Sequence, residues 1–242
     1  MARKPARPRS APRRPARAHA APTQGARGGT ERDRIIEALM ALLAEQPFER
    51  IGFGDIAGRA RISLAQLRGE FSSVVAILAA HIEETDRKVL AGGEGDMAEE
   101  PARERLFDVL MRRLEVLSPY KQAVRSLLRS TTRNPGLALA LNGMGARSQQ
   151  WMLTAADIKA SGPKGMIRSQ GLALLFARVL CVWVDDQDPG LARTMAALDR
   201  ELARGERWSG FLDDFCMIPE ALCRPGGWRA RRRSERDEAA AA

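Results

Sequence analysis

Residues 49–71 read ERIGFGDIAGRARISLAQLRGEF and contain the pattern that decides the fold. The segment predicts two short helices joined by a tight turn, the first over 55–60 and the second capped by Ser63. Gln66 occupies the third position of the second helix, where its side chain can reciprocate the cap. Two short helices in this arrangement are a helix-turn-helix, in which the second helix enters a DNA groove.

Longer helices are predicted on both sides of this segment. Thr30 begins an amphipathic helix with Asp33 as its capping partner, and Pro47 ends it. Its apolar residues recur at helical spacing and predict a buried stripe: Ile35, Ile36, Leu39, Leu42 and Leu43. A fourth helix is predicted to begin at Ser72 and to run through Leu90.

The rest of the chain also has helical spacing, and strand signals are nearly absent, so we expect an all-α protein. Turn residues separate helices predicted near 101–117, 119–133, 137–160, 164–186, 189–204 and 209–222. The predicted architecture is an N-terminal three-helix helix-turn-helix domain joined by a linking helix to a larger helical bundle. Its parts are a disordered basic arm (1–29), the helix-turn-helix and linking helix (30–90), a ligand-binding and dimerisation domain (96–222) and a flexible basic tail (223–242).

The net charge of +9 is concentrated at the ends of the chain. Residues 1–29 hold eight Lys or Arg and no acid, and residues 229–242 hold five Arg against three acids. Residues 30–90 hold eight basic and ten acidic side chains, which is −2. The helix-turn-helix region is therefore slightly acidic, and the arm is the part suited to non-specific phosphate contacts or a minor groove. A solubilising tail is the alternative interpretation of the arm.

The helix-turn-helix region resembles the TetR family of bacterial regulators. The resemblance rests on the first helix, on Phe48-Glu-Arg-Ile51, on Asp55-Ile-Ala57, and on Ile62-Ser63 with Leu67 and Phe71. It covers roughly residues 30–90 and implies a dimer that binds operator DNA. Family members usually carry Lys, Tyr, His and Lys at the positions that here hold Leu64, Arg68, Glu70 and Val74.

The larger domain resembles a second family, the accessory proteins of coenzyme Q biosynthesis. Similar segments follow in order over roughly 105–205: Arg113–Tyr120, Trp151 with Ala156-Asp157, and Asp185-Asp186 before Thr194–Arg200. That family uses a TetR-type fold to bind isoprenoid lipids and a partner hydroxylase. The resemblance implies common ancestry of the domain and leaves its task open.

The candidate DNA-contacting residues are Ser63, Gln66, Arg68, Arg61 and Arg27. Gln can pair with adenine, and Arg with guanine or a phosphate. The alternative is that Ser63 and Gln66 only cap the helix and that Arg68 faces solvent.

Four large residues of the bundle are candidates for an apolar ligand pocket: Trp151, Met152, Phe176 and Trp183. Such residues are more often plain core. The ligand they would take is a small apolar or isoprenoid compound.

The helices near 164–186 and 189–204 are those that TetR-like proteins use for a homodimer. Gly165, Gly171, Ala173 and Ala177 could permit close approach there, or could pack inside one subunit. The apolar run from Leu172 to Val184 is broken by Arg178 and is too short to span a bilayer, so no integral membrane segment is expected. Phe211, Leu212, Phe215 and Ile218 near the end of the chain suggest packing onto the bundle more than binding to a membrane surface.

Catalysis is not indicated. The two histidines, His19 and His81, form no triad, phosphate loop or zinc spacing with other residues. No metal or other cofactor is expected, and three cysteines without metal-type spacing suit a reducing cytoplasm. The sequence thus favours a ligand-modulated DNA-binding regulator. The alternative is a non-enzymatic lipid-binding accessory protein of ubiquinone biosynthesis whose helix-turn-helix is degenerate.

Overall fold

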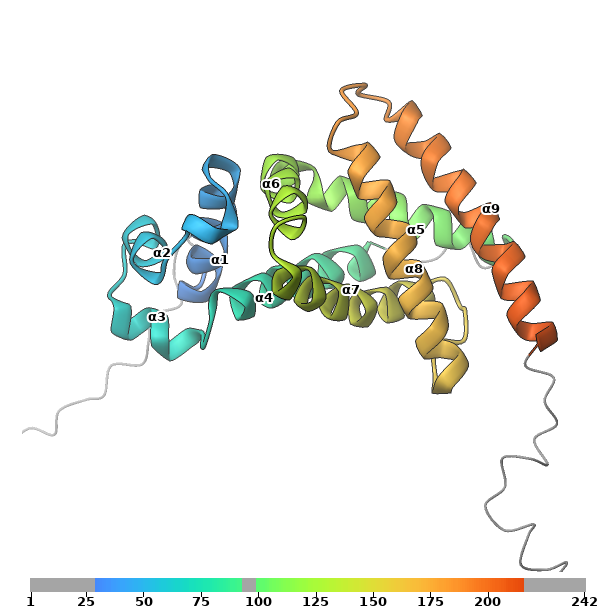
Figure 1. Ribbon diagram of the computed structural model, residues 1–242, viewed down its shortest axis with the longest axis horizontal. Coiled ribbons are helices and arrows are strands. Elements are labelled where there is room, and N and C mark those ends of the chain that lie inside the picture. The colour runs from blue at the N-terminus through green and yellow to red at the C-terminus, as the bar shows by residue number, and fades with distance from the viewer. Residues whose placement is uncertain (1–28, 93–98, 216–242) are drawn as a thin grey trace, which may run out of the picture.

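The computed structural model describes residues 29–92 and 99–215, and all its regular elements within those ranges are helical. The predicted all-α class is therefore confirmed. The elements are α1 (Glu31–Glu45), η1 (Phe48–Arg50), α2 (Phe53–Ala60), α3 (Leu64–Glu70), α4 (Val74–Ala91), α5 (Ala102–Leu117), η2 (Ser118–Tyr120), α6 (Lys121–Thr131), α7 (Pro135–Ala155), α8 (Gly162–Trp183) and α9 (Ala192–Phe215). Figure 1 shows α1, α2 and α3 at one end of the molecule and α9 at the other, with α4 and α7 running between them.

Local capping fixes the ends of the first helices. Thr30 Oγ1 accepts from the Asp33 N–H at 3.2 Å, and Asp33 Oδ2 accepts from the Thr30 N–H at 2.8 Å, which completes the predicted capping box. The turn between α2 and α3 closes when the Ile62 N–H donates to Ala57 O at 3.0 Å and the Arg61 N–H donates to Gly58 O at 3.3 Å. This is a Schellman motif, and it explains why α2 stops where it does.

Within residues 30–90, two predicted helix starts differ from the structure. The fourth helix is capped by Ser73, whose hydroxyl oxygen accepts from the Ala76 N–H at 3.0 Å, and not by Ser72. The second helix begins at Phe53, two residues earlier than predicted, because Asp55 accepts from the Gly52 N–H at 2.8 Å and so caps from inside the first turn.

The predicted break near Gly205 is wrong within the described residues. One helix, α9, runs from Ala192 to Phe215 through this glycine. Gly205 lies against α8, where a Cβ at its position would be 3.5 Å from Leu175 Cδ1. Packing against α8 outweighs the low helix propensity of glycine, which is only about 1 kcal/mol. The rest of the predicted helix over 209–222 lies outside the described residues beyond Phe215.

The buried apolar side chains form two clusters. The first cluster joins α1, α2, α3 and the start of α4, and it is completed by Ala123 and Leu127 of α6 and Leu137 of α7. The second joins the end of α4 to α5, α7, α8 and α9. The helix-turn-helix half therefore does not close its core alone, and α4 contributes to both clusters, with Ile77 in the first and Val89 in the second.

The loop after α8 is fixed by one carboxylate. Asp186 Oδ2 accepts from the Thr194 N–H at 2.9 Å and from the Thr194 hydroxyl at 2.7 Å. The hydroxyl bond holds the pKa of Asp186 below its usual range. Asp186 thus follows the end of α8 and orients the start of α9.

By length and composition alone, α8 could cross a membrane, and 33% of its most apolar window is buried in the structure. Leu172, Phe176 and Val179 on one side of it pack into the second cluster. At Gly165 a Cβ would lie 2.2 Å from the Ala160 backbone, so only glycine fits this close approach.

Candidate functional site

The second helix of the helix-turn-helix, α3, presents most of its side chains to solvent. Leu67 anchors it in the first cluster, whereas Ser63, Gln66 and Arg68 are exposed. Ser63 Oγ accepts from the Gln66 N–H at 3.1 Å, and Gln66 Oε1 accepts from the Ser63 N–H at 2.9 Å. The predicted reciprocal cap is confirmed, and it rigidly fixes the start of α3.

Gln66 has a second partner that the sequence did not indicate. Its Nε2 donates to Glu31 Oε2 of α1 at 3.3 Å. The oxygen and the amide nitrogen of this side chain are therefore both engaged within the protein. Pairing Gln66 with adenine would require these contacts to be exchanged.

Arg61 lies in the α2–α3 turn and Arg68 lies in α3, and both side chains are exposed. Over 29–92 and 99–215, neither guanidinium forms an ion pair or a hydrogen bond. Arg61 has φ = 56°, in the left-handed region, and its backbone makes the turn. Arg27, the fifth candidate for DNA contact, lies outside the described residues.

Arg32 of α1 contacts the acidic residue at the end of α3. Arg32 Nη1 lies 3.9 Å from Glu70 Oε2 and donates to Glu70 O at 3.5 Å. The same guanidinium lies over the Phe71 ring at 4.4 Å from its centroid. Because an opposite charge partly compensates Glu70, this carboxylate repels a nearby phosphate less than the sequence suggests.

Two apolar side chains also belong to the exposed surface around α3. Leu64 is 59% exposed and Phe53 is 44% exposed. Leu64 stands three residues before Leu67 and seven before Phe71, which is the spacing of one helix face, so apolar periodicity alone does not mark it as a surface residue. Apolar groups at such a surface can contact a thymine methyl group.

A buried ion pair joins the linking helix to the bundle. Arg113 of α5 donates to Asp86 Oδ1 of α4, and the Ser148 hydroxyl of α7 donates to the same oxygen at 2.7 Å. All three side chains are buried. Arg113 Nε and Gln149 Oε1 are buried nearby in α5 and α7 without a hydrogen-bond partner in the described region.

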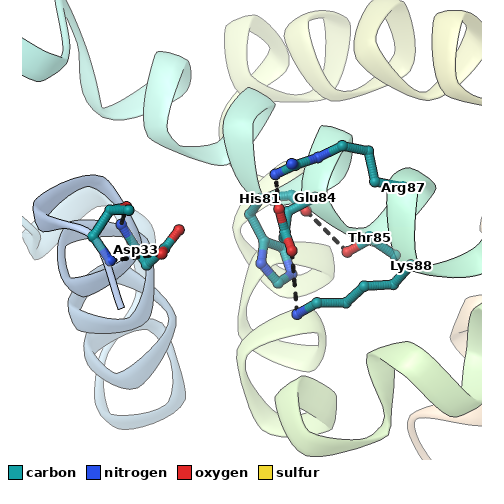
Figure 2. A network of polar contacts seen from close by, with 7 residues as sticks. Asp33, His81, Glu84, Thr85, Arg87 and Lys88 are labelled. Atoms are coloured by element: carbon teal, nitrogen blue, oxygen red, sulfur yellow. Dashed lines mark hydrogen bonds and ion pairs between the residues drawn. The ribbon is translucent and has the colours of Figure 1, made fainter. Parts of the chain in front are cut away.

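His81 lies five residues before Asp86 on α4, beside Tyr120 at the edge of the first cluster. Figure 2 shows it beside Thr85, whose hydroxyl donates to His81 O at 2.9 Å, and beside Glu84, which pairs with Arg87 and Lys88. Burial, with smaller contributions from Lys88 and Arg113, lowers the pKa of His81 to about 4. The imidazole is therefore neutral at physiological pH.

Tyr120 packs edge-on against His81, with ring centroids 4.6 Å apart. Its hydroxyl donates to Glu37 of α1. Burial, together with that carboxylate, raises the pKa of Tyr120 to about 12. A chain of contacts thus runs from α1 through η2 to α4, at the place where the helix-turn-helix half meets the bundle.

The structure brings together three of the four candidate ligand-pocket residues. Met152, Phe176 and Trp183 are buried in the second cluster. Arg113 lies over the Phe176 ring and Lys121 over the Trp183 ring, 5.6 and 5.4 Å from the centroids. Trp151 does not join them, because it is 58% exposed on the opposite side of α7.

The outer surface of α8 and α9 mixes charged residues, such as Arg178, Arg193 and Arg200, with four large apolar side chains. Met166, Ile167 and Leu174 of α8 and Met195 of α9 are exposed. Of the small residues singled out for close helix approach, Gly171 and Ala177 lie on this surface, whereas Gly165 and Ala173 are buried inside the subunit.

Comparison with solved structures identifies this arrangement of helices. A TetR transcriptional regulator from Nitrosomonas europaea superposes with a TM-score of 0.58 at 21% identity, covering 74% of this chain and 99% of that chain. A TetR transcriptional regulator from Rhodococcus sp. RHA1 gives 0.53 at 20% identity, covering 72% and 95%. The fold is that of TetR regulators. No family model and no curated protein sequence matches the chain.

In this TetR-like fold the helix-turn-helix lies at one end of the molecule and α9, which packs against α8, lies at the other (Figure 1). The linking helix α4 contacts both halves through its two ends. The likeness of residues 105–205 to the coenzyme Q accessory family stays an interpretation of the sequence.

Proposed function

We propose that the protein is a TetR-like transcriptional regulator that binds operator DNA as a homodimer. The observation that carries the proposal is a rigidly capped, outward-facing α3, beside which Arg61 and Arg68 have no ion pair in the described region. Guanidinium groups in this position suit guanine edges and phosphates. We propose no catalytic activity.

Each candidate residue is assigned a role in DNA binding according to its exposure and the hydrogen bonds that its side chain already makes. Arg68 points from the exposed face of α3 and is assigned to a base or a phosphate. Arg61, at the turn, is assigned to a phosphate, and Arg27 in the basic arm adds a further charge. Ser63 and Gln66, which bond to each other, hold the start of α3 in place.

Dimerisation compensates for the slightly negative net charge of each helix-turn-helix region. Two copies double the contact surface, since the second contact becomes intramolecular once the first is made. The exposed apolar residues of α8 and α9 are the surface proposed for this contact. Two basic arms then contribute phosphate contacts to one operator.

The regulatory ligand is proposed to enter the second cluster between α7 and α8, near Met152, Phe176 and Trp183. These buried side chains are apolar and suit an apolar compound, with Arg113 and Lys121 over two of the rings. Movement there would reach the helix-turn-helix through α4, because the Asp86–Arg113 ion pair ties α4 to α5. Ligand binding would thereby change the spacing of the two α3 helices in the dimer.

Fluorescence anisotropy on labelled promoter-upstream DNA tests the proposal, with the whole protein compared with a version lacking residues 1–29. Arg68→Ala is expected to weaken specific binding by about 1–3 kcal/mol. Arg147→Ala is the matched control, because Arg147 is an exposed arginine on α7 remote from α3. If neither the whole protein nor the version lacking residues 1–29 prefers any DNA sequence at low salt, the proposal fails.

One observation supports the second candidate, a lipid-binding accessory protein. Trp151, Met166 and Leu174 expose large apolar surface on α7 and α8, and α8 is apolar enough for a lipid environment. Mass spectrometry of lipids that co-purify with the protein separates the two. Bound isoprenoid lipid combined with no DNA preference would favour the accessory protein over the regulator.

A further inference from the structure

A groove of about 280 Å³ lies between the end of α1, η1 and α6. It is at the junction of the helix-turn-helix half with the bundle, and in Figure 1 the end of α1 and α6 are neighbours on the side away from α3. Its polar lining includes Glu45, Glu49, Arg125, Ser126, Arg129 and Arg133. None of these residues belongs to the DNA-contacting set or to the second cluster.

One edge of the groove is basic. Arg125, Arg129 and Arg133 follow one another at four-residue spacing along and just after α6, which places them on one side of the chain. Arg125 is already engaged, because it donates to Val184 O and lies 3.1 Å from Asp185 Oδ1. Arg129 and Arg133 are exposed, and neither guanidinium has an ion pair or hydrogen bond within the described ranges.

The opposite edge carries two carboxylates, of which one is neutralised. Arg59 Nη1 and Nη2 donate to the two oxygens of Glu45 at 2.9 and 2.6 Å, and these bonds lower the pKa of Glu45. Glu49 Oε2 accepts only from the Ser130 hydroxyl, at 3.1 Å. The groove is left with two uncompensated guanidinium groups and one uncompensated carboxylate, so its net local charge is positive.

Hydroxyl groups of α6 connect the two edges. The Ser126 hydroxyl donates to Gln46 O at 3.1 Å, and Ser130 Oγ accepts from the Phe48 N–H at 3.3 Å. These bonds hold η1 and the end of α1 against α6. A molecule in the groove therefore contacts the helix-turn-helix half and the bundle together.

We propose that this groove binds a small polar metabolite through an oxyanion group, held by Arg129 and Arg133. The planar guanidinium fork matches the two oxygens of a phosphoryl or carboxylate group, and such charge-assisted bonds are the stronger ones. The volume is below the usual range for drug-sized ligands and suits a compound the size of a sugar phosphate or a tricarboxylate. The uncompensated Glu49 carboxylate offers an acceptor to hydroxyl groups on the rest of the ligand.

Isothermal titration calorimetry on the full chain at physiological salt tests the site without DNA. The probes are inorganic phosphate, glucose 6-phosphate and citrate, with glucose as the uncharged control. We expect saturable binding of at least one anion with one site per chain, and no binding of glucose. Phosphate-bearing probes and citrate distinguish a phosphoryl ligand from a carboxylate ligand, and preference for either supports the site.

Matched variants locate the binding. The double variant Arg129→Gln/Arg133→Gln is expected to weaken the anion roughly tenfold or more, since each lost bond to a charged group contributes more than 1 kcal/mol. The control Arg147→Gln/Arg193→Gln removes the same charge from exposed arginines elsewhere and is expected to leave affinity unchanged. Glu49→Gln keeps an acceptor for Ser130 and is expected to tighten the anion.

Three results would overturn the proposal. They are no saturable heat with any anion in the millimolar range, equal weakening in both double variants, and glucose binding as well as glucose 6-phosphate. Far-ultraviolet circular dichroism of each variant verifies that it is folded. Because the readout is binding of the probe, the outcome is independent of whether the protein recognises an operator.

Discussion

The two buried clusters of this molecule are stabilised in different ways. The first, around α1 to α3, is apolar throughout, and its helices are bounded by bonds between residues three apart, such as Thr30 with Asp33 and Ser63 with Gln66. Beside the second cluster lies a buried charge pair, Asp86 with Arg113, whose partners are 27 residues apart in the chain. Ser148, which donates to the same carboxylate, is 62 residues from Asp86. Local bonds can be recognised from the order of residues, whereas the pair depends on the tertiary fold. The helix ends around the first cluster are therefore specified locally, whereas the charge pair forms only once α4, α5 and α7 have packed together.

Breaking the buried pair should have the largest effect. Arg113→Met leaves Asp86 buried without its counter-ion, and we expect the free energy of unfolding to fall by about 3–5 kcal/mol. Arg112→Met is the control, because Arg112 is the neighbouring residue and pairs with Asp108 within α5 in a less buried position. That change should cost at most about 1 kcal/mol. Urea unfolding followed by circular dichroism measures both.

A double variant tests whether the charge or the packing matters. Asp86→Leu/Arg113→Met removes both charges, and we expect it to be more stable than Arg113→Met alone. If Arg113→Met costs no more than Arg112→Met, the Asp86–Arg113 pair stabilises the fold no more than an exposed ion pair does.

The pH dependence of stability sharpens the comparison at the boundary between the clusters. Burial keeps His81 neutral in the folded protein, with a pKa of about 4 against 6.5 when unfolded, so the unfolded state binds a proton first as pH falls. The contribution of His81 to stability is complete above pH 6.5 and is lost progressively toward pH 4, by roughly 3 kcal/mol. His81→Phe should lose this part of the pH dependence. The measurement is the difference in unfolding free energy between wild type and variant at several pH values, and parallel curves would contradict it.

The smallest expected effect on stability is that of removing the N-cap of α4 at Ser73. Ser73→Ala removes the oxygen that accepts from the Ala76 N–H, and we expect a loss of about 1 kcal/mol. Ser72→Ala is the matched control, because Ser72 is exposed and caps nothing in the described residues; its effect should lie within about 0.5 kcal/mol. Thermal unfolding of the two variants compares them directly. Equal effects would mean that α4 does not depend on its N-cap.

Much of the helix-turn-helix could be predicted from the sequence because its determinants are local. The caps at Thr30 and Ser63 and the apolar spacing of Leu67 and Phe71 depend on residues three or four apart. Ser72 and Ser73 are adjacent and identical, so the sequence does not show which of them caps α4. The backbone conformation places the cap at Ser73. The sequence pattern also could not predict that α9 continues through Gly205, because this depends on contact with Leu175 of α8.

The candidate sites were predicted less completely than the fold. Met152, Phe176 and Trp183 do gather, but periodicity alone did not reveal that Trp151 faces outward. The second contact of Gln66, with Glu31, joins residues 35 apart and leaves no local signal. No local signal in the sequence indicates that α6 completes the first cluster, since Leu127 follows the helix-turn-helix by more than fifty residues.

At Arg61, the backbone conformation of the α2–α3 turn and the proposed DNA contact favour different residues. A left-handed backbone position is most easily occupied by glycine, and a residue with a Cβ costs roughly 1 kcal/mol or more there. Selection for heat resistance alone would therefore enrich Arg61→Gly, whereas the proposed contact of Arg61 with a phosphate predicts that selection for DNA binding would retain the arginine. Parallel selections on a randomised codon 61 would show which pressure has shaped this turn.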